Sequence, residues 1–541
     1  MRPGAKAARA ERGRVRGWRP RADMVASKDN FPLLAELLAE QQRLATPVAK
    51  FSEAHEHAAA PALEPVYRDL IPLTAPKPGE QYAFEVELDS CTGCKACVSA
   101  CHSLNGLDDN ETWRDVGLVV GGDDRRPFQQ TVTTACHHCA EPGCLSGCPV
   151  LAYEKDPITG IVRHLDDQCI GCQYCVLKCP YDVPKYNARL GIVRKCDMCH
   201  GRLAEGEAPA CVQACPTQAI RIVTVKAEAP VARARGHGGF LPGAPDPDYT
   251  RPTTRYVSRK GLAADLRAAD AAALRVQPAH WPLVGTLTLV PFAVGCFGAA
   301  AAVGGREESV IHYMTLWGAA AAVLGVGISV AHLGQPLRAW RVFLGWRKSW
   351  LSREAMVLGA WLPVVGAAVW APALSGVAAA VGAVGLICSA MLYADTRRAF
   401  WAAGFGAAKI LGTAVVLGAA MMLAMGVAVE IATAVLAAGV VGKLACDARV
   451  IRVLDEVDED APAVGRAASA RLLKGPLWRV FASRIVLGLS GGVLLPMQVL
   501  TGVAPAWVAW AAFVAVAVGE LTERYLFFRA VDAPKMPGVA A

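Results

Sequence analysis

The first 23 residues contain no apolar core of the kind found in secretory signals, and no two adjacent arginines. We therefore expect neither a cleavable signal nor a twin-arginine export signal. Charged residues are also scarce: they make up 19% of the 541-residue chain, against 54% hydrophobic residues. This composition excludes a wholly soluble protein and predicts that part of the chain lies in lipid.

Cysteine is nearly missing from the second half of the chain, where only three of the nineteen cysteines lie. The other sixteen fall between Cys91 and Cys215. Because we expect no export to an oxidising compartment, a disulfide framework is excluded. The net charge of +8 comes from a basic N-terminal tail and from residues beside apolar runs. The position of the charge predicts no nucleic-acid partner: the tail is a solvated segment or a leader before Met24, and contact with the anionic surface of a lipid bilayer is the functional alternative.

The sixteen cysteines form four regularly spaced groups. The groups are Cys91-x2-Cys94-x2-Cys97-x3-Cys101, Cys136-x2-Cys139-x4-Cys144-x3-Cys148-Pro149, Cys169-x2-Cys172-x2-Cys175-x3-Cys179-Pro180 and Cys196-x2-Cys199-x11-Cys211-x3-Cys215-Pro216. Closely spaced cysteines can hold three corners of one iron–sulfur cube, while the fourth reaches a neighbouring cluster. Sixteen thiolates, at four per cube, predict four 4Fe–4S clusters. Zinc is the alternative, but it leaves the third and fourth cysteine of each group unexplained.

The order of the groups and the wider x4 and x11 gaps resemble the iron–sulfur subunit of the dimethyl sulfoxide reductase family, over roughly residues 82–225. The resemblance implies an α+β domain of two nested ferredoxin-like folds, in which the groups pair first with fourth and second with third. It implies four ligand sets: Cys91, Cys94, Cys97 and Cys215; Cys196, Cys199, Cys211 and Cys101; Cys136, Cys139, Cys144 and Cys179; Cys169, Cys172, Cys175 and Cys148. His102 departs from the family pattern, in which proline often follows the fourth cysteine, but this leaves the ligand set intact.

Long apolar runs follow, and they predict an all-α bundle of eight transmembrane helices. The expected spans are about 281–303, 312–333, 355–374, 377–394, 408–426, 428–446, 484–503 and 505–528. The chain then divides into an N-terminal extension with a short helix (1–80), the four-cluster domain (81–226), a linker or arm (227–279), the bundle (280–530) and a C-terminal tail (531–541). Alternating segments at 84–88, 160–165 and 219–225 predict strands.

The bundle resembles the membrane anchor subunit of the same family in the stretch HLGQPLRAWR at 332–341 and in SREA at 352–355. The resemblance implies a quinone site at His332 and Glu354, with Arg338 nearby. Quinol oxidation releases protons, and histidine titrates near neutrality while a carboxylate can pass protons onward. The structural alternative is that His332 ends one helix and Glu354 caps the next. Glu430 is a second candidate for proton handling, whereas Asp395, Lys443 and Asp447 are assigned structural roles at span ends.

Lysine and arginine set the expected orientation. With eight spans, nineteen of these residues lie on the side of both termini, and only Arg306 lies on the other. Positive charge stays in the cytoplasm. We therefore expect a multi-pass protein of the bacterial inner (plasma) membrane, with the iron–sulfur domain and both termini cytoplasmic.

The sequence thus predicts a fused electron-transfer and membrane-anchor subunit with no catalytic residues other than those for quinol oxidation. The resemblance implies that electrons pass from the membrane quinone pool through the clusters to a separate molybdopterin-containing catalytic subunit. Two alternatives stay open. One is the reverse flow, in which a cytoplasmic dehydrogenase such as a sulfite oxidiser reduces quinone. The other is a proton-translocating membrane module, which predicts buried ionisable residues across the bundle.

Overall fold

The computed structural model describes residues 64–123, 125–228, 240–263, 265–304, 308–455 and 464–539. The helix predicted within the N-terminal extension lies outside these residues. A compact unit runs from Val66 to Ala541, and the architecture below is that of this unit.

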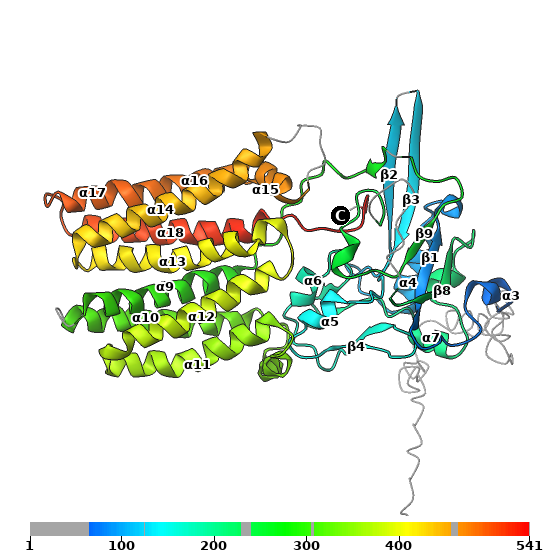
Figure 1. Cartoon of the computed structure of the whole chain (residues 1–541), viewed down its shortest axis with the longest axis horizontal. Helices are drawn as coiled ribbons and strands as arrows, with labels where there is room; N and C mark the ends of the chain where they lie inside the picture. The colour runs from blue at the N-terminus through cyan, green and yellow to red at the C-terminus, as the bar shows by residue number, and fades with distance from the viewer. Residues whose placement is uncertain are drawn as a thin grey trace, which may run out of the picture. The chain divides into compact units, whose positions relative to one another are not determined.

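The cysteine-rich part combines short helices with small sheets (Figure 1). Its strands are β1 (Glu80–Glu87), β2 (Asp115–Asp123), β3 (Arg126–Thr134), β4 (Tyr153–Lys155), β5 (Val162–His164), β6 (Lys185–Asn187), β7 (Ile192–Arg194), β8 (Ile220–Lys226), β9 (Arg255–Val257) and β10 (Arg267–Ala268). Its helices are α4 (Ala96–Leu104), α5 (Gly143–Gly147), α6 (Tyr174–Lys178), α7 (His200–Ala204) and α8 (Ala210–Gln213), and the short α3 (Glu64–Tyr67) precedes them.

The strands that open and close the cysteine-rich region pair with each other. β1 runs antiparallel to β8, with Glu80 opposite Lys226, and buries the apolar side chains of Ala83, Phe84 and Val86. A second sheet has the order β10-β2-β3, and β4-β5 and β6-β7 are separate hairpins. The pairing of β1 with β8 brings the first and last cysteine groups together. The three strands predicted from the sequence correspond to β1, β5 and β8.

The stretch expected to be a linker or arm supplies strands to both larger sheets. β9 lies parallel to β1, and β10 lies antiparallel to β2. The sequence did not reveal this because each strand has only two or three residues, too few for alternation to be visible. The described part of the stretch 227–279 is therefore integral to the cysteine-rich domain.

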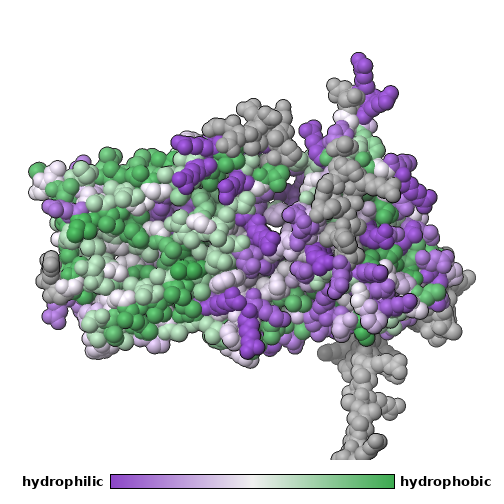
Figure 2. Space-filling view, viewed as in Figure 1, coloured by the Kyte–Doolittle hydropathy of each residue, from purple (hydrophilic) through white to green (hydrophobic). Residues whose placement is uncertain are grey.

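The C-terminal part is an all-helical bundle. Its helices are α9 (Trp281–Val303), α10 (Glu308–Ala331), α11 (Trp350–Trp370), α12 (Ser375–Ala394), α13 (Ala403–Ala424), α14 (Val429–Arg452), α15 (Gly465–Lys474), α16 (Trp478–Leu489), α17 (Leu495–Leu500) and α18 (Trp507–Arg529). On the face seen in Figure 2, hydrophobic side chains cover most of the bundle, whereas hydrophilic ones gather over the cysteine-rich domain and beside it. A sheath of this kind is expected where the surrounding solvent is lipid.

The structure supports six of the eight predicted spans, since six segments in the described residues are long and apolar enough to cross a membrane. They are Trp281–Val303, Glu308–Ala331, Pro372–Ala394, Ala403–Ala424, Val429–Arg452 and Trp478–Leu500. The other two predicted spans are the helices α11 and α18, which carry charge within their length. Arg353 and Glu354 lie near the start of α11, and Glu520, Glu523 and Arg524 lie within α18. These charges lower the apolar content of both helices.

Candidate iron–sulfur sites and the junction with the bundle

Each cysteine group begins with a loop whose residue before the second cysteine has a positive φ. These residues are Gly93, His138, Gly171 and Met198, with φ of 72°, 41°, 69° and 59°. A left-handed residue turns the backbone sharply, which lets the flanking cysteines face one centre. Glycine adopts this conformation freely, whereas a side chain adds strain of about 1–3 kcal/mol. At His138 the ring nitrogen Nδ1 accepts a hydrogen bond from the backbone of Val162 at 3.0 Å, which helps to offset the strain.

The three Cys-Pro turns also share one backbone conformation. The third residue after the cysteine is Leu151, Asp182 or Gln218, with φ of 56°, 54° and 54°. The turn aims the next amide back at the sulfur: Ala152 donates to Cys148 Sγ at 3.2 Å, and Ala219 donates to Cys215 Sγ at 3.3 Å. Amide donors stabilise negative charge on thiolates and are among the factors that set cluster potentials. The turns therefore suit the chemistry of a cluster-bound thiolate.

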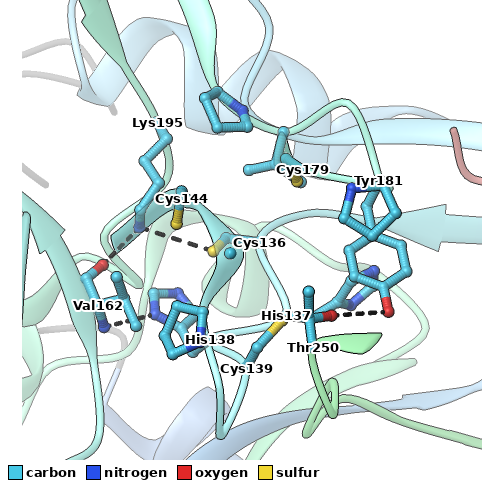
Figure 3. Close-up of a pocket in the computed structure, with 15 residues that line it drawn as sticks. Cys136, His137, His138, Cys139, Cys144, Val162, Cys179, Tyr181, Lys195 and Thr250 are labelled. Atoms are coloured by element: carbon cyan, nitrogen blue, oxygen red, sulfur yellow. Dashed lines mark hydrogen bonds between the residues drawn. The ribbon is translucent and has the colours of Figure 1, made fainter. Parts of the chain in front are cut away.

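The folded chain gathers cysteines that are distant in sequence. One cavity is lined by Cys136, Cys139, Cys144 and Cys179, a second by Cys91, Cys94, Cys97 and Cys215, and a third by Cys148, Cys169, Cys172 and Cys175. Figure 3 shows the four sulfur atoms of the first of these cavities around a common space. In the fourth predicted set, Cys101 lies within electrostatic range of Cys199 and Cys211, and Cys196 within that of Cys101. Each grouping joins residues of two cysteine groups.

The buried cysteines favour the neutral thiol unless a cation is bound. Burial raises the pKa of Cys101 to about 12 and the pKa of Cys148 and Cys199 to about 11. Thiolates at these positions therefore need a cationic partner, which the iron of a cluster supplies.

A 4Fe-4S dicluster domain profile matches residues 128–225. The probable anaerobic dimethyl sulfoxide reductase chain YnfG of Escherichia coli K12 is 37% identical over 183 residues, which are 32% of this chain and 86% of the relative. An anaerobic dimethyl sulfoxide reductase subunit of Haemophilus influenzae is 35% identical, over 32% of this chain and 87% of the relative. The chain belongs to the iron–sulfur subunits of the dimethyl sulfoxide reductase family. The iron–sulfur subunit of formate dehydrogenase-O from E. coli K12 is also similar, with 34% identity over 29% of this chain and 57% of the relative.

Membership of this family supports iron–sulfur clusters, electron transport and a partner subunit for catalysis. In the described residues, the C-terminal bundle with its six membrane-length helices is consistent with fusion of such a subunit to a membrane anchor.

The iron–sulfur part of this family member contacts the bundle through the loops around Cys148 and Cys169–Cys175. Gln335 donates its backbone amide to Ile170 O at 3.0 Å, and Ser352 Oγ donates to Pro149 O at 3.4 Å. The contact is tight at Gly171, where a Cβ atom would lie 2.3 Å from Gly191 O and 2.9 Å from the backbone of Gly334.

A second set of contacts converges on Asp395 at the end of α12. Lys178 forms an ion pair with Asp395 at 2.8 Å, and the hydroxyl of Tyr174 donates to the same carboxylate at 3.0 Å. Tyr249 donates its hydroxyl to the backbone oxygen of Asp395 at 3.0 Å. Asp395 was assigned to a span end from the sequence, and the structure gives it this role at the junction.

The predicted quinone residues lie close to this junction. His332 directly follows α10, and its ring lies 5.4 Å from that of His280. Burial and the neighbouring His280 lower the pKa of His332 to about 4, so the imidazole is neutral at physiological pH. Glu354, in the first turns of α11, accepts a hydrogen bond from Ser389 of α12. Arg338 donates to Cys169 O at 3.3 Å, in the loop of one predicted cluster site. No hydrogen bond or ion pair joins these three residues in the described part of the chain.

The bundle also holds a buried charge network that the sequence analysis missed. Its members, on α13, α14, α16 and α18, are Lys409, Lys443, Asp447, Arg484, Glu520, Glu523 and Arg524, all 7% exposed or less. α14 extends to Arg452, beyond the predicted end at 446, so Asp447 as well as Lys443 lies within the helix. The run from Glu520 to Arg524 could have been found, since charges spaced three and four apart share one helix face.

Proposed function

We propose that this chain carries electrons from membrane quinol through four 4Fe–4S clusters to a separate, molybdopterin-containing catalytic subunit, and that it anchors that complex in the membrane. Sixteen cysteines in four groups, the three four-cysteine cavities and the fourth cysteine cluster support the count of four. The relatives named as reductase and dehydrogenase subunits support the catalytic partner.

The proposal is supported chiefly by the contacts that residues close in sequence to the predicted quinone residues make with one predicted cluster site. Gln335, three residues after His332, and Ser352, two residues before Glu354, bond directly to the loops of Cys169 and Cys148. Electrons leaving a quinol between these segments have a cluster site as their nearest acceptor. The opposite end of the series is the site of Cys91, Cys94, Cys97 and Cys215. Cys94 is exposed there, which suits electron exit to a partner subunit.

The chemistry divides between the two parts of the chain. When bound, a 4Fe–4S cluster takes up or releases one electron at a time. Quinol oxidation also frees two protons. The neutral imidazole of His332 accepts a hydrogen bond from one quinol hydroxyl, and the Glu354 carboxylate, held by Ser389, takes a proton onward. Arg338 fixes the loop of Cys169 against this segment.

Orientation follows from the same residues. Five of the nineteen positive residues counted on one side are buried (Arg398, Lys409, Lys443, Arg484 and Arg524), so fourteen remain against Arg306. The bias still favours a cytoplasmic iron–sulfur domain in the bacterial inner membrane. The count assumes eight spans, so in this proposal α11 and α18 also cross the membrane beside the six candidate spans. Reverse flow, in which a dehydrogenase reduces quinone, uses the same residues.

The cluster count is tested by iron and acid-labile sulfide analysis of the purified full chain, with low-temperature EPR after reduction. The expected result is about sixteen iron and sixteen sulfide atoms per chain. Protein that contains zinc and no sulfide contradicts the proposal.

The quinone site is tested with His332→Ala and Glu354→Gln. Both variants are expected to slow cluster reduction by quinol at least tenfold, with unchanged iron content and unchanged reduction by dithionite. Matched controls are His312→Ala, at the other end of α10 and about 30 Å away along the helix, and Glu430→Gln, whose side chain is exposed. If quinol reduces the clusters of both variants at the wild-type rate, His332 and Glu354 have only structural roles.

A further inference from the structure

A buried lysine lies between two of the four predicted cluster sites. Lys195 directly follows β7 and is 2% exposed. It lines the cavity of Cys136, Cys139, Cys144 and Cys179 (Figure 3). No acidic side chain lines that cavity among the described residues. The function proposed above uses this cavity but gives the lysine no role.

The contacts of the Lys195 amino group define its charge. Nζ donates to Val162 O, to Cys196 O at 2.7 Å and toward Cys136 Sγ at 3.6 Å. All three partners are acceptors, and three donated protons are the full complement of an ammonium group. A neutral amine has only two protons and would leave one acceptor without a donor. The three acceptors therefore match the three protons of a lysine ammonium group in the protein interior.

Lys195 also joins two predicted cluster sites. Cys136 belongs to one ligand set, and Cys196 belongs to the set with Cys101, Cys199 and Cys211. The side chain contacts the sulfur of the first and the backbone of the second. The carboxylate of Asp197 is the nearest acidic group in sequence, but it is 31% exposed and already accepts a hydrogen bond from Cys199 N at 2.9 Å. Solvent screens much of its charge, whereas that of Lys195 is unscreened.

We propose that the ammonium group of Lys195 raises the reduction potentials of the two central clusters and so keeps the middle of the electron path accessible. The inference rests on the proposed function. An electron added at the Cys136 or Cys196 site increases the negative charge there without a proton being taken up, and the buried cation stabilises the reduced form. Net charge and hydrogen bonds to sulfur are among the factors that set cluster potentials.

The test is a redox titration of the full chain, followed by low-temperature EPR, with Lys195→Met. This variant keeps most of the side-chain length and removes the charge. At a fixed ambient potential, the reduced-to-oxidised ratio of two clusters is expected to fall about tenfold, equivalent to a shift of ~59 mV for one electron. The other two clusters keep their potentials. Lys195→Arg, which retains the charge, is expected to keep both potentials close to their wild-type values, and Lys185→Met, at a half-buried site paired with Asp182, is the matched control.

Iron and sulfide analysis separates the possible failures. A wild-type chain without clusters refutes the proposed function itself. If Lys195→Met holds its full iron complement and all four potentials are unchanged, the lysine only positions the loop and the inference is wrong. An equal shift of all four potentials, or the same shift in Lys195→Arg, also overturns it, because neither pattern follows from a local charge.

Discussion

Glu523 is the hub of the buried charge network, and Glu523→Gln is the sharpest test of what the network does. The carboxylate lies 3.1 Å from the ammonium of Lys409, 2.5 Å from that of Lys443 and 3.5 Å from the guanidinium of Arg484, and it is 1% exposed. Neutralising it leaves four buried cations against two carboxylates. Removing one partner of a buried ion pair typically destabilises a protein by about 3–5 kcal/mol.

The assay is thermal unfolding of the full chain in detergent. At roughly 2–4 °C per kcal/mol for a domain of 150–250 residues, the loss corresponds to a decrease in melting temperature of roughly 6–20 °C. Glu430→Gln, at an exposed position in the same bundle, is expected to change it by less than ~2 °C. The double variant Lys443→Met with Glu523→Gln restores the balance of charge and recovers part of the loss. Equal melting temperatures for Glu523→Gln and Glu430→Gln would refute the reasoning.

Three further predictions concern the junction and the quinone site. Gly171→Ala adds a Cβ at a φ of 69° and 2.3 Å from a backbone oxygen, so iron per chain is expected to fall by about four atoms, measured by iron analysis. Asp395→Asn removes the ion pair with Lys178 and is expected to slow quinol-driven cluster reduction severalfold at unchanged iron content, measured by stopped flow. Because the pKa of His332 is lowered to about 4, its imidazole stays neutral from pH 8 down to pH 5. The rate of quinol-driven cluster reduction is therefore expected to show no decrease from protonation of His332 in this range. The measurement is a pH profile of the rate in the wild-type chain and in His332→Ala.

The cysteine spacing was enough to predict the cluster domain, because ligand spacing follows from the shape of the cube. The positive φ at Gly93 and Gly171 was also accessible, since glycine marks such turns. At His138 and Met198 the same conformation is imposed by the fold on residues that do not prefer it. No local signal reveals it there. β9 and β10 were missed for a related reason: strands this short are defined by their partners.

In the bundle, composition predicted the helices but not their inner faces. The composition of a segment gives the same value whether a given residue faces lipid or a neighbouring helix. Consequently α18, whose Glu520 and Glu523 pair with a buried lysine, is not among the six candidate spans, although the sequence predicted a span at 505–528. Neighbouring helices decide which charges can be buried, and this information lies far away in the sequence.

The position of the network bears on the proton-translocating alternative. Lys409 lies near the start of α13, and Asp447 near the end of α14, so the ion pair between them belongs to one end of the bundle. At the opposite ends of α10 and α14 the acidic residues are Glu308 and Glu430, and both are exposed. A path for protons across the membrane needs buried ionisable groups along its whole length. Among the described residues the network stops within one half, which favours a role in holding four helices together beside an electron-transfer site.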